Sequence, residues 1–237
     1  MIDALVRPGD AVVDAGANWG LYAARLAQLV GRAGQVDAFE PHPSHAGTLR
    51  ALAARRPQLA AHELALSDTA GSATLHVPII QRRGITALAS LHAPRAGLKH
   101  EAITVPVATL DAALAGRRPP SFVKVDVEGM ELAMLRGAEQ TLRAARPTLI
   151  VEIEQRHQVA PIAVTFAYLE ALGYVGHFFG ARGLAPLADF DVERDQLRHL
   201  GQATPEYGMP AGYVADFLFA DPALDVPGSL ARMRHAI

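Results

Sequence analysis

The sequence predicts an α/β fold in which a mostly parallel sheet is covered by helices on both faces. Short apolar runs alternate with longer stretches that carry apolar residues at helical spacing. This alternation is typical of doubly wound parallel sheets. Half of the 237 residues are hydrophobic, which is enough to bury a sizeable core. We therefore expect a single domain over residues 1–237, with its core between about 10 and 220.

The first half of the chain holds three predicted strands and two predicted helices. A buried strand over 11–14 precedes a helix over 19–30, and two glycines follow that helix. A second strand over 36–39 leads to a helix over 43–55, with one proline in its first turn and another beyond its end. Residues 60–66 form the third predicted strand.

The second half continues the alternation and ends with two further strands. In chain order, the predicted elements are a strand over 122–126, a helix over 130–144, a strand over 148–152, a helix over 161–172, and strands over 174–179 and 213–219. Two stretches, 78–102 and 180–212, interrupt the alternation. Connections this long are usually functional lids or mobile surface loops, and neither stretch resembles a separate domain.

Charge and composition narrow the classes of partner. The formal net charge of -2 lacks the basic excess typical of nucleic-acid-binding proteins. No apolar run reaches the ~20 residues of a membrane span, and the first residues lack the pattern of a signal peptide. The chain has no cysteine, so disulfides and thiolate metal sites are excluded. We expect a cytoplasmic protein that binds neither nucleic acid nor membranes, in an oligomeric state that the sequence leaves open.

The loop after the first predicted strand is the first place to look for a ligand, because open α/β sheets bind ligands beyond the carboxyl ends of their strands. It contains Asp14-Ala15-Gly16-Ala17-Asn18-Trp19-Gly20. Gly16 leaves room for a ligand, and Gly20 permits close packing of the next helix. The G-x-G-x-x-G pattern of dinucleotide sites is absent, because Ala17 and Asn18 stand where that pattern needs its second glycine.

Asp14 shifts the prediction from a dinucleotide to S-adenosylmethionine (SAM). Its carboxylate would repel a pyrophosphate, whereas it suits the amino and sulfonium charges of SAM. We expect Asp14, Gly16, Asn18 and Gly20 to belong to that site. A purely structural strand-to-helix turn is the alternative, and Trp19 packs either over the ligand or in the core.

Two further strand ends complete the predicted nucleoside site. Glu40 follows the second strand at the distance where an acidic residue accepts hydrogen bonds from both ribose hydroxyls. Pro41 fixes the turn that aims it, and a solvated carboxylate is the alternative. After the third strand, Leu66, Ser67 and Asp68 are expected to belong to the cofactor site, with Leu66 packed on the adenine and Asp68 accepting a hydrogen bond from its amino group. An ordinary turn, in which Ser67 and Asp68 bond their own backbone, is nearly as well supported.

Together these motifs resemble those of the FkbM methyltransferases, a branch of the class I SAM-dependent methyltransferases. The resemblance runs from about Val12 to Phe219. It rests on the loop at 14–20, Phe39-Glu40-Pro41, Ala65-Leu66-Ser67-Asp68, Thr109-Leu110-Asp111 and Glu152, and most specifically on Val123-Lys124-Val125-Asp126-Val127-Glu128-Gly129-Met130-Glu131 followed by Leu135-Arg136-Gly137-Ala138. It implies a seven-stranded sheet with an antiparallel last strand, and methyl transfer to oxygen on sugars, polyketide-derived compounds or other natural products. The implied partner is a small-molecule or glycan methyl acceptor.

Acidic residues after the fourth and fifth strands are the candidate catalytic groups. Asp126, Glu128, Glu152 and His157 could orient a hydroxyl, accept its proton or, in the case of the carboxylates, hold a divalent cation. Asp126 is also expected at the cofactor. Capping of the next helix is the alternative for Asp126 and Glu128, and an ordinary loop histidine is the alternative for His157.

Several nearby side chains have a structural interpretation. Glu131 is expected to cap the helix that follows the fourth strand, and Lys124 to pair with a carboxylate or to extend to the edge of the sheet. The scattered histidines do not predict a metal site; they are His42, His45, His92 and His100.

Two other functions stay open at this point. An NAD-dependent oxidoreductase is disfavoured by the missing second glycine and by Asp14. A non-catalytic module that retains the fold is disfavoured by the intact glycine loop and by Glu40.

Overall fold

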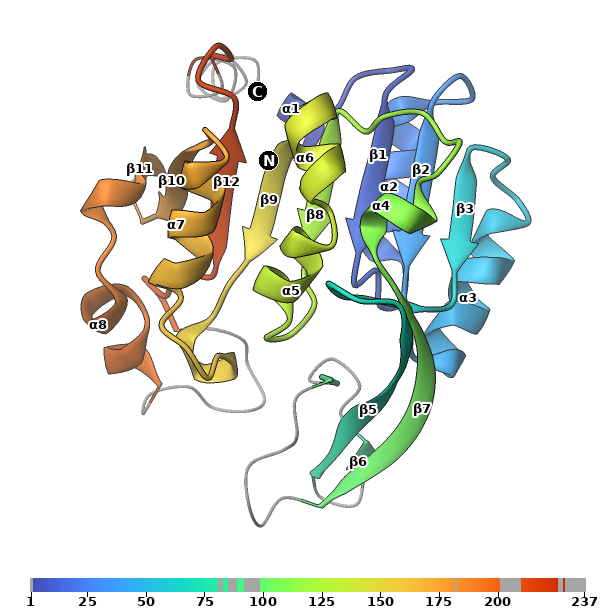
Figure 1. Ribbon diagram of the computed structural model, residues 1–237, viewed down its shortest axis with the longest axis horizontal. Helices are drawn as coiled ribbons and strands as arrows, with labels where there is room; N and C mark the ends of the chain where they lie inside the picture. The colour runs from blue at the N-terminus through green and yellow to red at the C-terminus, as the bar shows by residue number, and fades with distance from the viewer. Residues whose placement is uncertain are drawn as a thin grey trace.

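The computed structural model describes residues 2–80, 83–84, 89–91, 99–181, 183–200, 210–225 and 228. Its centre is a sheet of eight strands (Figure 1). In spatial order they are β11 (Gly183–Pro186), β10 (Val175–Gly180), β12 (Asp216–Ala220), β9 (Thr148–Glu152), β8 (Phe122–Val125), β1 (Ala11–Ala15), β2 (Gln35–Phe39) and β3 (Leu59–His62).

The predicted fold class is confirmed. Neighbouring strands from β9 to β3 are parallel, and β12 runs antiparallel to both of its neighbours. The sheet has eight strands rather than the expected seven because β11 pairs antiparallel with β10 and adds an edge.

Helices cover both faces of this sheet (Figure 1). One face carries α1 (Ile2–Leu5), α2 (Leu21–Val30) and α3 (Pro43–Ala53), and the other carries α4 (Leu110–Ala113), α5 (Glu131–Arg136), α6 (Glu139–Ala145) and α7 (Ala163–Ala171). Because side chains alternate along a strand, Val12 packs into the cluster on the α2 side and Val13 into the cluster on the α7 side.

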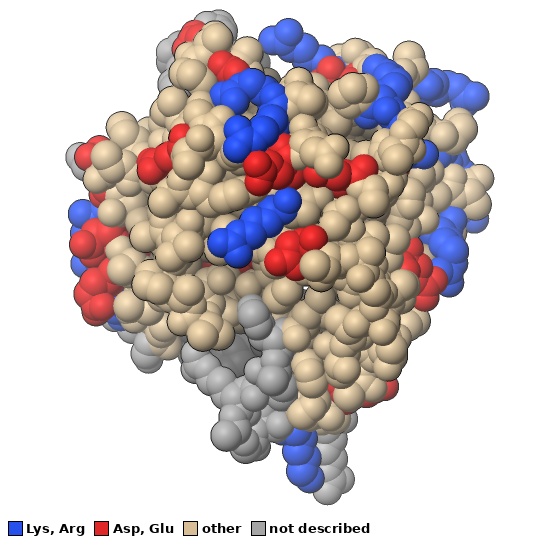
Figure 2. All heavy atoms as spheres, in the orientation of Figure 1, with Lys and Arg blue, Asp and Glu red and all other residues tan. Residues whose placement is uncertain are grey.

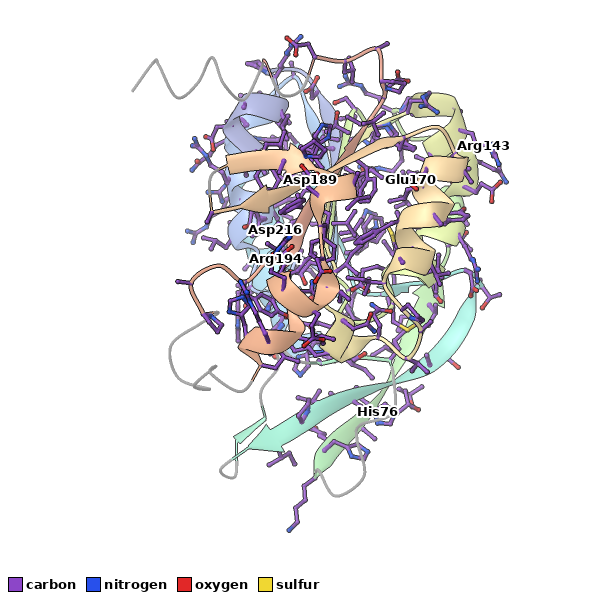
Figure 3. The ribbon with its side chains drawn as sticks, turned by 90° about the vertical axis from the view of Figure 1, so that its left-hand side faces the viewer. His76, Arg143, Glu170, Asp189, Arg194 and Asp216 are labelled. Atoms are coloured by element: carbon purple, nitrogen blue, oxygen red, sulfur yellow. The ribbon has the colours of Figure 1, made fainter. Side chains whose placement is uncertain are left out.

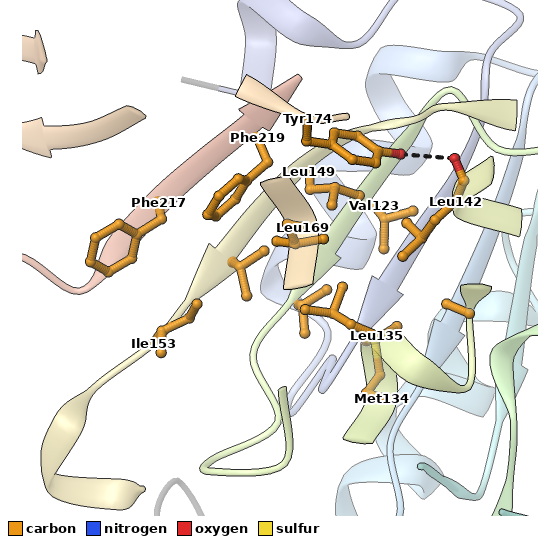
Figure 4. Packing of buried hydrophobic residues seen from close by; sticks show 14 of the residues in the cluster. Val123, Met134, Leu135, Leu142, Leu149, Ile153, Leu169, Tyr174, Phe217 and Phe219 are labelled. Carbon is orange, nitrogen blue, oxygen red and sulfur yellow. Dashed lines mark hydrogen bonds between the residues drawn. The ribbon is translucent and has the colours of Figure 1, made fainter. Parts of the chain in front are cut away.

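The cluster on the α7 side is the larger of the two and is built mainly of aliphatic and aromatic side chains (Figure 4). Its one drawn polar contact is a hydrogen bond of 3.1 Å, which the Tyr174 hydroxyl donates to the Leu142 carbonyl oxygen. The outer surface of this face carries acidic and basic side chains in mixed groups (Figure 2). Among the described residues, no helix combines the length and the apolar character needed to cross a membrane.

Two elements that the sequence predicted as continuous are divided. The strand expected over 60–66 becomes β3 and a separate β4 (Ala65–Leu66), which belongs to a different sheet. The helix expected over 130–144 becomes α5 and α6, which are separated at Gly137 and Ala138. There the chain lies against the Ser67 backbone so closely that a Cβ at Gly137 would come within 2.0 Å of the Ser67 carbonyl oxygen. Tertiary packing has therefore overridden the helical pattern.

The stretch expected as a loop over 78–102 contains strands at both of its ends. Strand β5 (Gly71–Ile80) extends into it, and β7 (His100–Ala108) begins before it ends. With β4 and the short β6 (Arg83–Gly84) they form a four-stranded sheet, in the order β4-β7-β5-β6, that projects away from the core (Figure 1). We call β5, β6 and β7, together with residues 89–91, which pair with β5, the arm. Residues 81–82, 85–88 and 92–98, including His92, lie outside the described residues.

The stretch expected as a loop over 180–212 is likewise partly ordered. It contains β11, two 3₁₀ turns and α8 (Val192–Asp195), while residues 182 and 201–209 lie outside the described part. Asp191 caps α8 by accepting a hydrogen bond of 2.7 Å from the Arg194 amide. Short elements of this kind carry little periodic signal, which explains why the sequence pattern missed them.

Candidate functional site

The candidate site lies where the strand order changes direction. From β1 the chain proceeds through β2 to β3 on one side, whereas β8 and β9 lie on the other. Such a switch point is where open α/β sheets bind ligands. Here Gly16 has a φ of 78°, and a Cβ on it would come within 1.7 Å of the Asp126 carbonyl oxygen. The glycine was expected for its backbone freedom and for the room it leaves to a ligand, and the close contact between the ends of β1 and β8 also requires it.

A cavity of about 660 Å³ opens at this point. Six of the predicted cofactor residues line it: Gly16, Asn18, Glu40, Pro41, Leu66 and Asp126. Most of the other lining residues are apolar, and they come from β2, β4, the arm and the loop after β8; the full set adds Phe39, Leu64, Ala65, Leu75, Ala89, Ser90, Leu91, Val127, Glu128 and Met130.

Glu40 is fixed by the backbone of the neighbouring loops. It is only 7% exposed, and its two carboxylate oxygens accept hydrogen bonds of 2.8 Å from the amides of Asn18 and His42. Burial raises the pKa of Glu40, although these two amide donors oppose that effect. Asn18 reaches its position with a φ of 50°, which asparagine tolerates better than most residues. The solvated carboxylate considered as an alternative is therefore not what the structure contains.

Asp14, by contrast, does not line this cavity. Its side chain is fully buried, with its Oδ1 at 3.7 Å from the Nζ of Lys124. Burial raises the pKa of Asp14, while the charge of Lys124 opposes the shift. The same ammonium donates a hydrogen bond of 3.0 Å to Asp126, which confirms that Lys124 is paired with carboxylates. Asp14 thus helps to hold the buried charge of Lys124 beneath the site.

Four other residues that the sequence singled out do not line this cavity. Gly20 allows the close packing expected of it, since a Cβ there would lie 2.9 Å from the Leu49 side chain. Ser67 is buried, and its hydroxyl donates a weak hydrogen bond of 3.4 Å to the carboxylate of the exposed Asp68. Trp19 is 57% exposed beside His45, with ring centroids 4.0 Å apart, so the expectation that it packs in the core is wrong.

A second, smaller cavity of about 180 Å³ adjoins the first, and we call it the acidic pocket. All four predicted catalytic residues line it: Asp126, Glu128, Glu152 and His157. Two further carboxylates, Glu131 and Glu154, also line it, together with Gly129. Asp126 and Glu128 line both cavities, so the two cavities meet at these side chains.

Burial, together with the crowding of like charges, raises the pKa values of carboxyl groups in the acidic pocket. Burial, reinforced by Asp126 and other carboxylates, raises the pKa of Glu128 to about 9. The same two causes raise the pKa of Glu152 to about 8; Asp216 also contributes, because it pairs with Glu152 across β12 and β9 (Asp216 is labelled in Figure 3). Burial also raises the pKa of Glu131 to about 7.

Basic groups offset only part of this negative charge. Arg156 lies 2.8 Å from a Glu154 carboxylate oxygen, and the Nε2 of His157 lies 3.6 Å from Glu128 and 3.7 Å from Glu154. Glu131 accepts a hydrogen bond of 2.9 Å from the Gly129 amide at the start of α5, as expected of a capping group. Among the described residues, no group of three or more His, Asp or Glu side chains is arranged to hold a metal ion.

Sequence reasoning missed the contribution of the arm. Leu75 of β5 and the segment Ala89-Ser90-Leu91 line the large cavity, although they lie outside every motif. No local pattern distinguishes these residues from an ordinary surface loop, and only the folding of the arm brings them to the site.

Comparison with known proteins gives a consistent assignment. The family model described as the methyltransferase FkbM domain matches residues 14–175. The structure is similar to methyltransferase FkbM from Methylobacillus flagellatus KT, with a TM-score of 0.55, 17% identity and 89% of this chain covered. This chain spans 43% of the length of that protein. None of the curated proteins matches the chain.

Two other solved methyltransferases align with lower scores. Precorrin-6y C5,15-methyltransferase from Geobacter metallireducens GS-15 aligns with a TM-score of 0.47 at 12% identity, covering 93% of this chain and 85% of that one. A SAM-dependent methyltransferase from Aquifex aeolicus aligns with a TM-score of 0.46 at 12% identity, covering 92% of this chain and 85% of that one.

Proposed function

Because this chain belongs to the FkbM methyltransferase family, we propose that it uses SAM to methylate a hydroxyl group of a small-molecule natural product or a sugar. One observation carries the proposal. The cavity that contains Gly16 and Glu40 joins the acidic pocket at Asp126 and Glu128. A nucleoside site and a set of candidate bases therefore share one wall.

The large cavity has the chemistry that a nucleoside needs. Apolar side chains such as Phe39, Leu66 and Met130 suit a purine ring, and Glu40 can accept hydrogen bonds from ribose hydroxyls. Gly16 lines this cavity with main-chain atoms alone. When bound, SAM would supply a methyl group on a positively charged sulfur.

The acidic pocket would act on the acceptor. Its hydroxyl must come within about 3 Å of the methyl carbon and must lose a proton as the new bond forms. We assign the role of proton acceptor to Glu128, because this carboxylate lines both cavities. Glu152 and His157 are its neighbours in the acidic pocket and could pass the proton on. Asp126, held by Lys124, would orient the hydroxyl.

The positive charge of a cofactor bound in the large cavity would change the pKa of Glu128. Burial and like charges raise the pKa of Glu128 to about 9, so this carboxyl is largely protonated at neutral pH in the free protein. A positive charge placed at the junction would lower the pKa of Glu128, since an opposite charge favours the ionised form. Glu128 would thus become a base chiefly when the cationic cofactor is present.

The cofactor assignment is tested by isothermal titration with SAM. We expect the unmodified protein to bind SAM and Glu40→Ala to bind it about 100-fold more weakly, because each hydrogen bond to a charged group contributes about 1.5–3 kcal/mol. Glu63→Ala is the matched control, since Glu63 is an exposed carboxylate paired with Arg50 outside the cavity. Unchanged affinity in Glu40→Ala, or tight binding of NAD with none of SAM, would overturn the assignment.

The acceptor class is tested by a screen. Sugars and phenols are incubated with SAM and the protein, and methylated products are identified by mass spectrometry. With the acceptor that reacts, the rate is measured again after treatment with excess EDTA. A rate that falls on chelation and returns with Mg²⁺ would assign a divalent cation to the acidic residues, and an unchanged rate would leave the proton transfer to the side chains alone.

A further inference from the structure

The arm reaches the candidate site through a short segment that contains Ser90. The segment pairs with β5, because the His76 amide donates to the Ser90 carbonyl at 2.8 Å and the Ser90 amide donates to the His76 carbonyl at 3.1 Å. Figure 3 labels His76 on the arm, below the core. The flanking side chains of Ala89 and Leu91 pack against a small buried cluster that includes Leu75. The segment is therefore held in place by the arm.

From this position Ser90 contacts the loop after β8. Its hydroxyl donates a hydrogen bond of 2.5 Å to the main-chain carbonyl oxygen of Glu128. Glu128 has a φ of 46°, a left-handed conformation that is uncommon for a residue with a long side chain. Such a conformation persists only where the surrounding structure supports it. The Ser90 hydroxyl is one such support, and it comes from outside the loop.

The conformation of Glu128 decides where its carboxylate lies. It places the side chain between the two cavities, where it faces Asp126 of its own loop, Glu131 of α5, Glu152 of β9, and Glu154, Arg156 and His157 of the segment after β9. These surroundings bury most of the carboxyl and add like charges, which together raise its pKa. A loop free to relax would let the side chain turn toward solvent.

We propose that Ser90 is a positioning residue, through which the arm holds the Glu128 carboxylate at the junction of the two cavities. Ala89 and Leu91 line the large cavity on either side of this contact, so the same segment covers the nucleoside site and fixes the base. The arm is then part of the site, and its sequence helps to determine reactivity. The catalytic meaning of this assignment rests on the proposed function; the position of Glu128 does not.

The proposal is tested by titrating Glu128 directly. Protein labelled with ¹³C-glutamate is followed by NMR from pH 5 to pH 10, and the Glu128 carboxyl resonance is assigned by its loss in Glu128→Gln. We expect a midpoint near 9 in the unmodified protein. In Ser90→Ala the midpoint should fall by about one pH unit or more, as the carboxylate gains access to water.

Two further variants separate positioning from general disturbance. Ser90→Thr retains a hydroxyl and should keep the midpoint of the unmodified protein. Ser72→Ala removes an exposed serine from β5, the strand with which the Ser90 segment pairs, and should also leave the midpoint unchanged. A Glu128 midpoint that is the same in Ser90→Ala as in the unmodified protein would overturn the proposal. The proposal would also be overturned if Ser90→Thr and Ser72→Ala lowered the Glu128 midpoint as much as Ser90→Ala does.

This measurement is independent of ligand, so its failure is distinct from failure of the proposed function. If Ser90→Ala shifts the Glu128 titration but the unmodified protein does not bind SAM in calorimetry, the positioning role stands and the proposed function fails. If SAM binds but the titration does not move, the proposed function stands and the role of Ser90 is rejected.

Discussion

The two cavities at the carboxyl end of the sheet are built on opposite principles. The larger one is mainly apolar, and Glu40 in it is satisfied by two main-chain amides. The acidic pocket holds five carboxylates, of which Glu128 and Glu152 have strongly raised pKa values. The first suits binding by shape and fixed hydrogen bonds, and the second suits proton transfer. One sheet edge thus provides two environments because its loops differ in charge.

The largest effect is expected at Gly16, which packs against Asp126, a residue that lines both cavities. We expect Gly16→Ala to lower the free energy of unfolding by about 3 kcal/mol or more and to abolish SAM binding. The new Cβ would lie 1.7 Å from the Asp126 carbonyl oxygen, so the loops after β1 and β8 must separate. Urea denaturation and calorimetry measure the two effects.

Gly116→Ala is the control for backbone strain alone. Gly116 has a φ of 76°, close to that of Gly16, but a Cβ there would meet nothing within 4 Å. Gly116→Ala should lower the free energy of unfolding by about 1 kcal/mol and leave SAM affinity unchanged. If Gly16→Ala and Gly116→Ala lowered the free energy of unfolding equally, the contact between the ends of β1 and β8 would be unimportant for stability.

The acidic pocket predicts a specific dependence of stability on pH. Glu128 has a pKa near 4.5 when unfolded and about 9 when folded, so between these values the native state binds more protons and stability falls as pH rises. We expect Glu128→Gln to be close to the unmodified protein in stability at pH 5 and to be more stable than it by several kcal/mol at pH 9, because each pH unit between the two pKa values corresponds to about 1.4 kcal/mol. Urea denaturation at both pH values tests this.

The control for this prediction is an exposed carboxyl outside the pocket. Glu170 on α7 is exposed and is labelled in Figure 3, so Glu170→Gln should change stability by the same small amount at both pH values. If Glu128→Gln behaved in this way too, the Glu128 carboxyl would not be buried among like charges.

The smallest effect concerns Asn18 in the larger cavity. Its amide nitrogen holds Glu40 through the main chain, whereas its side-chain oxygen is buried and accepts no hydrogen bond from any described residue. We expect Asn18→Gly to preserve stability, since glycine tolerates the positive φ, and to weaken SAM binding about fivefold through the loss of one hydrogen bond. Asn18→Ala should additionally cost about 1 kcal/mol of stability. SAM affinity unaffected in both variants would mean that only the main chain of Asn18 contributes.

The order of strands and helices followed from the sequence with few errors, because buried parallel strands are continuous apolar runs and the helices between them keep a clear period. Errors arose where packing overrode local pattern. Gly137 divides a predicted helix where the chain meets Ser67, and the arm emerged from a stretch expected as a loop. Its strands are mostly exposed or half-buried, and among their described positions only Leu75, Val77 and Val105 are buried apolar residues.

For the candidate site, the sequence by itself determined the residue types: the glycine loop, Glu40, and the acidic residues that follow the fourth and fifth strands. Their place in the chain was sufficient, because carboxyl ends of parallel strands share one edge of the sheet. Only the tertiary structure decided which of them face a cavity. Asp14 turns toward Lys124 beneath the sheet edge, whereas Ser90 arrives from the arm. Side-chain direction and contacts between distant segments depend on packing across the whole chain, and no local pattern encodes them.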